Sequence, residues 1–186
     1  MKNERKKGDT DLRLLSLGVQ YFVLARQAVF LGFSPPCGNL YHLAFEVLIK
    51  SVLAKKHDRE KLKGFSHNLP RLWREFRKIY DDRAFDRFDS TIKNLHKYEP
   101  LRYLDFPKGG YWAMSMTIDF GEGLKPKADI LKKNRQVHFS FNFDEMDELF
   151  KVIIIKASIN PPFLKTYFGL REGLKIYKKD NRHSLY

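Results

Sequence analysis

Residues 39–50 read NLYHLAFEVLIK, and this stretch decides the fold class. One narrow polar stripe runs along it, formed by His42, Glu46 and Lys50 at steps of four. The other side chains are mostly apolar, recur with the period of a helix and cover the rest of its circumference: Leu40, Tyr41, Leu43, Ala44, Phe45, Val47 and Leu48. A helix that is apolar nearly all round is buried among other helices. Because an unpaired polar group is costly to bury, the stripe must be exposed, paired or used.

The segments on either side show the same helical period. We expect a first helix over residues 10–31 and a second from the prolines at 35–36 to about residue 55. Four further helices are expected over residues 69–80, 83–98, 144–158 and 163–178. Ser34, Pro35 and Pro36 are expected to break the chain between the first two helices, since proline cannot continue a helix. Asn68 is a suitable cap for the third helix, after a charged loop at 55–66, and Asp144 for the fifth.

Between the fourth and fifth helices the apolar period changes from helical to two. Apolar residues alternate with polar ones over 111–120 and again over 137–143. Period two is the signal of a half-buried strand. The sequence therefore predicts a mainly α protein with a small antiparallel strand pair inserted before the fifth helix.

Composition and charge limit the classes of function. The chain has 186 residues, a formal net charge of +13 and one cysteine. The charge favours an anionic partner. A single cysteine excludes an internal disulfide and a multi-cysteine zinc site. No apolar run is long enough to cross a bilayer and no signal peptide is recognisable, so we expect a cytoplasmic protein with no membrane partner.

Four segments resemble the HEPN family (higher eukaryotes and prokaryotes nucleotide-binding). They are YFVLARQAVFLG (21–32), GNLYHLAFEVLIKSVLAKK (38–56), FSHNLPRLW (65–73) and LHKYEPLRYLDFP (95–107). The resemblance implies an antiparallel helical bundle that often dimerises. Its members include ribonucleases of toxin and antiviral systems, and non-cleaving modules beside nucleotidyltransferases. The cleaving members carry an Arg four to six residues before a His on the last bundle helix, and this chain lacks that motif. We therefore assign no catalytic residue.

The resemblance also implies a domain organisation. We expect residues 1–8 to form a flexible basic tail and residues 9–186 to form a single HEPN-like domain. Within that domain, residues 108–143 are the strand-containing insertion, and residues 161–186 are a C-terminal helix and tail.

Five residues are candidates for a ligand groove. Arg26 lies on a semi-buried face of the first helix, where Glu46 is its natural partner. That pair is either a structural ion pair or a guanidinium held ready for a phosphate. His42, Glu46 and Lys50 form either an ordinary helix-stabilising stripe or a polar groove, with His42 as acid or base and Lys50 on an anion. Arg102 either binds a phosphate or caps a helix end.

These residues lead to one expected function and two alternatives. We expect a non-catalytic nucleotide- or RNA-binding module of a toxin, defence or nucleotidyltransferase-associated system. Its partners would be nucleotide or RNA, a second copy of the chain, and a nucleotidyltransferase or antitoxin. One alternative is a metal-independent ribonuclease with a nonstandard Arg/His pair, and the other is a basic protein–protein interaction module. Scattered histidines and the lack of a glycine-rich phosphate loop predict neither a metal site nor a cofactor.

Overall fold

The structure is a computed structural model that describes residues 10–100, 142–169 and 171–186. Its elements are α1 (Leu12–Phe30), α2 (Ser34–Leu53), α3 (Arg59–Gly64), α4 (Leu69–Tyr80), the 3₁₀-helix η1 (Arg83–Phe88), α5 (Asp89–His96), α6 (Phe143–Lys156), α7 (Pro161–Leu164), the 3₁₀-helix η3 (Lys165–Phe168) and α8 (Arg171–Lys178). The mainly helical class predicted from the sequence is confirmed. No described helix is both long and apolar enough to span a bilayer.

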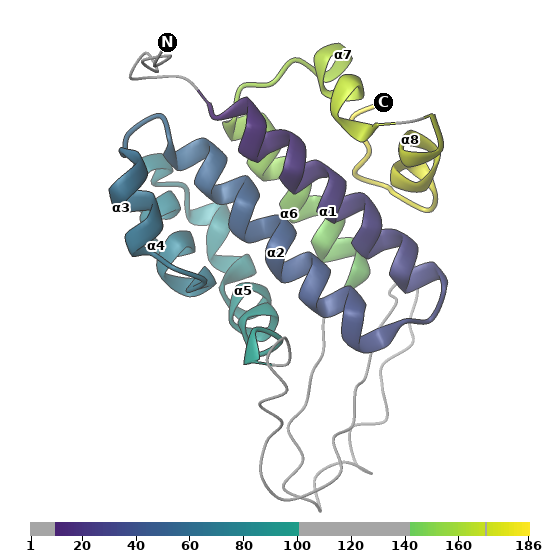
Figure 1. Cartoon of the computed structure of the whole chain (residues 1–186), viewed down its shortest axis with the longest axis horizontal. Helices are drawn as coiled ribbons and strands as arrows, with labels where there is room; N and C mark the ends of the chain where they lie inside the picture. Colours follow the sequence, from purple (N-terminus) through teal and green to yellow (C-terminus); the bar gives the residue numbers. More distant parts are fainter. Residues whose placement is uncertain (1–9, 101–141, 170) are drawn as a thin grey trace, which may run out of the picture.

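Helices α1 and α2 form an antiparallel hairpin through the middle of the molecule (Figure 1). The Asp11 side chain caps α1 by accepting hydrogen bonds from the backbone N–H groups of Arg13, at 3.0 Å, and Leu14, at 3.3 Å. The hairpin packs closely because Gly18 of α1 faces Leu48 of α2. A Cβ atom at Gly18 would lie 2.6 Å from Cγ of Leu48.

The other helices surround this hairpin (Figure 1). Helices α3, α4 and α5 lie on the side of α2, α8 lies beside α1, and α6 runs behind both helices of the hairpin. Aromatic rings join the layers. Phe22 of α1 stacks on Phe150 of α6 with ring centroids 4.1 Å apart, and Tyr177 of α8 lies 5.4 Å from Phe150. These fully buried rings dominate the core, because aromatic side chains bury the largest apolar area.

The structure corrects the start of the second helix and the nature of the charged loop. Pro35 and Pro36 lie in the first turn of α2 and do not break the chain before it. First-turn N–H groups have no acceptor within the helix, so proline is tolerated there. The predicted loop at 55–66 contains α3, which Asp58 caps through the N–H of Lys61 at 2.8 Å. Leu62 anchors this short helix in the core.

Two later helices also differ from the prediction. The expected continuous helix at 83–98 is divided into η1 and α5, which ends at His96. The last helix is divided as well, because η3 ends at Phe168 and is followed by Gly169, where φ is 73°. Such a positive φ favours glycine and stops a helix.

The expected strand pair and the residues beside it complete the comparison. The tail at 1–8 and the strand at 111–120 lie outside the described residues, as does all of the strand at 137–143 except its last two positions. Phe143 is the first residue of α6 and not the end of a strand. Asn142 caps α6, where Asp144 had been expected, because its side chain accepts hydrogen bonds from the N–H groups of Asp144 and Glu145.

Candidate functional site

The polar stripe of α2 faces inward, toward the turn between α3 and α4. Glu46 is almost fully buried and His42 is fully buried. The Glu46 carboxylate accepts a hydrogen bond from Nζ of Lys50 at 2.8 Å and lies 3.0 Å from Nδ1 of His67. Nδ1 of His42 lies 4.0 Å from the same carboxylate. One buried anion therefore gathers three nitrogen-bearing side chains, which together we call the Glu46 cluster.

Lys50 also holds the turn that precedes α4. Its Nζ donates to the backbone carbonyl of Ser66 at 2.7 Å. Ser66 has a φ of 50°, a left-handed conformation that is unfavourable for a residue other than glycine. The next residues are His67, which contacts Glu46, and Asn68, whose side chain caps α4 through the N–H of Arg71 at 2.9 Å. The strained turn is thus fixed from both sides, and it sets the position of His67.

His67 brings the cluster to the molecular surface. Its side chain is 46% exposed, whereas that of Lys50 is 16% exposed and that of Glu46 only 5%. The hydrogen bond to a carboxylate assigns the proton of neutral His67 to Nδ1, which leaves a lone pair on Nε2. Within the described residues, Nε2 makes no hydrogen bond. His67 can therefore accept or donate a proton at the edge of the cluster.

A third histidine, His96, extends the cluster toward α5. The ring of His96 stacks on that of His42, with centroids 5.7 Å apart and planes 20° from parallel. Nδ1 of His96 lies 3.5 Å from Nε2 of His42, at the outer limit of a hydrogen bond. The row of ionisable groups thus runs from His96 through His42 to Glu46 and then to His67.

Arg26 does not belong to this row, and its expected pairing with Glu46 is wrong. The fully buried guanidinium donates to Asp147 of α6, to the carbonyl of Ile176 at 3.1 Å and to the carbonyl of Lys179. It also lies 4.4 Å from the ring centroid of Phe143. The face of α1 that carries Arg26 points toward α6 and α8 and not toward the stripe of α2. The structural alternative for Arg26 is therefore the one that its contacts favour.

Burial also shapes the titration of the partner of Arg26. Desolvation raises the pKa of Asp147 to about 6, although the Arg26 guanidinium opposes this rise. The pair is enclosed among aromatic side chains and faces the C-terminal segment. It fastens that segment to the bundle.

Three of the five predicted site residues are therefore brought together, namely His42, Glu46 and Lys50. Arg102 lies outside the described residues. His67 and His96 were not among the residues predicted for the site. The signal for His67 was present, because a carboxylate on a buried helix face needs more than one donor. The stacking of His96 on His42 depends on where α5 packs, which local sequence does not show.

Among the described residues, no three His, Cys, Asp or Glu side chains are grouped so that they could hold a metal ion. Comparisons of the chain with protein-family models, with curated proteins and with solved structures find no match. What the cluster does must therefore follow from its own geometry and charge.

Proposed function

We propose that the protein is a HEPN-like module that binds nucleotide or RNA, and that a phosphate of the ligand binds at the exposed edge of the Glu46 cluster. The observation that carries this proposal is the convergence of Lys50 and His67 on one buried carboxylate. An ammonium group has three donors, and Glu46 and Ser66 accept two of those of Lys50. The third donor of Lys50, and the Nε2–H of His67 when the imidazole is protonated, provide two donors for a phosphate oxygen.

Two features of the whole chain support an anionic ligand and this class of module. The formal net charge of +13 attracts polyanions at long range. Three of the four HEPN-like segments fall on α1, on α2 and on the turn that begins α4, and the fourth begins in α5. The second, third and fourth segments contain His42, Glu46 and Lys50, then His67, then His96, so three of the four segments that carry the resemblance also carry the cluster and its extension.

One observation favours a second candidate, the metal-independent ribonuclease. The imidazole of His67 is oriented by a carboxylate, which is how a general base is commonly held. In such a reaction Nε2 would accept the proton of a ribose 2′-hydroxyl as its oxygen bonds to the adjacent phosphorus, and the P–O5′ bond would break with the 5′-oxygen taking a proton from water. The Lys50 ammonium would stabilise charge on the phosphate in the transition state. The cluster thus contains a base and a cation, although this chain lacks the Arg that the cleaving HEPN members carry four to six residues before a His.

The proposed partners include a second copy of the chain, besides a nucleotidyltransferase or antitoxin. Leu17 and Leu24 are exposed on α1, and Leu31 is exposed at its C-cap, so the three follow one another at steps of seven. Apolar residues at that spacing form the seam of paired helices. This stripe lies on the other face of α1 from the fully buried Phe22 and suits self-association.

The test is binding and cleavage measured on the same samples. Fluorescence anisotropy with a labelled RNA oligonucleotide and with a labelled mononucleotide measures affinity at low salt. A denaturing gel without added metal measures cleavage. We expect His67→Gln and Lys50→Met each to weaken binding about tenfold, which corresponds to about 1.4 kcal/mol. Lys175→Met, an exposed lysine on α8, is the matched control and should bind as the natural chain does.

The outcomes separate the two candidates. Binding without cleavage supports the module, and cleavage that His67→Gln abolishes supports the ribonuclease. If neither RNA nor mononucleotide binds, or if both cluster variants bind normally, the proposed site is wrong. Circular dichroism of each variant shows whether the helices are retained, because Lys50 also fixes the turn at Ser66.

A further inference from the structure

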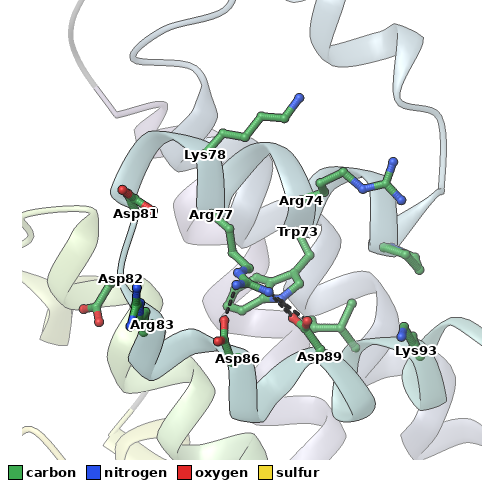
Figure 2. A pocket seen from close by; sticks show the side chains of 12 residues that line it. Trp73, Arg74, Arg77, Lys78, Asp81, Asp82, Arg83, Asp86, Asp89 and Lys93 are labelled. Carbon is green, nitrogen blue, oxygen red and sulfur yellow. Dashed lines mark hydrogen bonds and ion pairs between the residues drawn. The ribbon is translucent and has the colours of Figure 1, made fainter.

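The outward face of α4 carries a row of cations. Every residue of α4 that is exposed is basic: Arg71, Arg74 and Lys78. They are spaced three and four residues apart, so they share one side of the helix, and His67 lies four residues before Arg71. Figure 2 shows Arg74 and Lys78 pointing away from the bundle, whereas Arg77 turns inward toward Asp86 and Asp89. We call Arg71, Arg74 and Lys78 the basic ridge.

Two hollows flank this ridge. One, of about 610 Å³, lies between α4, η1 and α5, and Trp73 and Ile92 are among its apolar lining residues. The other, of about 330 Å³, lies between α3 and α4, beside Phe65. Arg74 and Lys78 line both hollows. These two cations therefore lie on the raised surface between the two hollows, where a flexible ligand could cross the helix or run along it.

Most carboxylates near the ridge already have cationic partners, although Asp81, which lines the larger hollow, makes no ion pair within the described residues. Five basic and four acidic side chains line that hollow, so the cations are in excess. Arg77 pairs with Asp86 and also with Asp89, at 2.7 Å, and the Trp73 N–H donates to Asp89 at 2.8 Å. Glu75 is shared among Lys78, at 3.4 Å, Lys61, at 3.9 Å, and His57, at 3.0 Å.

The remaining cations around the larger hollow have no such partners. In the described part of the chain, Arg74, Arg83 and Lys93 make no ion pair or hydrogen bond through their side chains. A ligand that supplied phosphates would give them partners.

We propose that the basic ridge binds the phosphate backbone of an RNA strand and guides that strand to His67. This inference rests on the proposed function and makes the ligand a strand, since a mononucleotide does not carry a row of phosphates spaced along its length that could extend over α4. From Arg71 to Lys78 the helix rises about 10 Å, which is enough to contact more than one phosphate of a strand. The contacts are to phosphates and the nearby aromatic residues are buried, so binding along the ridge is tolerant of sequence.

The test is the salt dependence of RNA binding. We expect Arg74→Gln/Lys78→Gln to make the negative slope of log K against log salt shallower by about 1.4, because each lost contact between a cation and a phosphate of a single strand removes about 0.7 from its magnitude. The control is Arg171→Gln/Lys175→Gln, which removes the same charge from exposed positions on α8. It is closely matched, because Lys175 pairs with Glu172 at i,i+3 just as Lys78 pairs with Glu75. The control should leave the slope as it is in the natural chain.

The outcomes distinguish the ridge from the proposed function. If the natural chain binds RNA and the ridge and control variants have equal slopes, the ridge is wrong and the module stands. If the chain binds mononucleotide as tightly as the oligonucleotide, the ridge is again wrong and nucleotide binding stands. If it binds neither, both proposals fail. Arg74→Gln/Lys93→Gln tests the same side of the ridge with a different pair, should the first variant lose its helical circular dichroism.

Discussion

Replacing Arg26 by Met tests how the C-terminal segment is fastened to the bundle. Arg26 and Asp147 are both fully buried, and Arg26 also donates to two backbone carbonyls beyond and within α8. The variant leaves the Asp147 carboxylate without a countercharge and both carbonyls without this donor. Removing one partner of a buried ion pair costs about 3–5 kcal/mol. That loss is a large part of the stability of an ordinary domain, so the free energy of unfolding should fall visibly.

The loss should also depend on pH. Burial raises the pKa of Asp147 to about 6 from its ordinary 3.8, so between these values the folded chain holds a proton that the unfolded chain has released. The raised pKa of Asp147 therefore adds to the free energy of unfolding below about pH 4, and this contribution is lost as the pH rises through about 6. In Arg26→Met the guanidinium that lowers this pKa is gone, so the pKa rises further. The destabilisation of the variant should therefore be larger at pH 8 than at pH 5, by up to about 1.4 kcal/mol for each unit of added pKa.

Urea unfolding followed by tryptophan fluorescence at both pH values measures these differences. The companion variant is Arg26→Met/Asp147→Leu, which replaces the whole pair by apolar side chains. It should recover most of the loss at pH 8, because an apolar substitute for a buried pair is often neutral. A loss under about 1 kcal/mol for the single variant, a loss independent of pH, or a double variant no better than the single one would refute this account of the pair.

Three further predictions concern other buried or capping groups. Cys37 is fully buried, and desolvation raises the pKa of its thiol to about 12. A thiol reagent at neutral pH should therefore label Cys37 only upon unfolding. Rapid labelling of the folded chain would contradict this. Gly38→Ala should lower the free energy of unfolding in urea by about 1–3 kcal/mol, because the added Cβ would lie 2.1 Å from an atom of the Tyr98 ring. An unchanged urea midpoint of unfolding would disprove this contact. Asn68→Ala should cost about 1 kcal/mol through loss of the α4 cap at Arg71, and Asn68→Asp, measured beside it, should keep most of that stability.

The parts of the fold that depend on local sequence could be predicted. The apolar period placed α2 in the core, its polar stripe was recognised, and Asn68 was identified as the cap of α4. These features depend on residues within one or two turns of each other. The prediction failed where two local signals compete, as at Pro35 and Pro36, which suit both a break and the first turn of a helix.

The partners of buried charges could not be predicted in the same way. Arg26 and Glu46 lie on neighbouring helices and have opposite charge, yet each is paired elsewhere. Which faces of two helices meet depends on their rotation and crossing, and these are set by the packing of the whole core. Asp147 is distant in sequence and lies on a helix whose apolar stripe gave no reason to single it out.

The buried carboxylates of Glu46 and Asp147 differ in a way that favours the α4 side of the bundle for the proposed ligand site. Asp147 is held by Arg26, which is itself fully buried and bonded to backbone carbonyls, so a ligand could reach this pair only by displacing α8. Glu46 is held by Lys50 and His67, which retain exposed surface and unused hydrogen-bonding capacity. Both carboxylates stabilise the packing, but only the second arrangement can change partners without unfolding. The exposed cations of α4 begin at Arg71, four residues after His67, so the basic ridge starts directly beyond the turn that carries the exposed edge of the cluster.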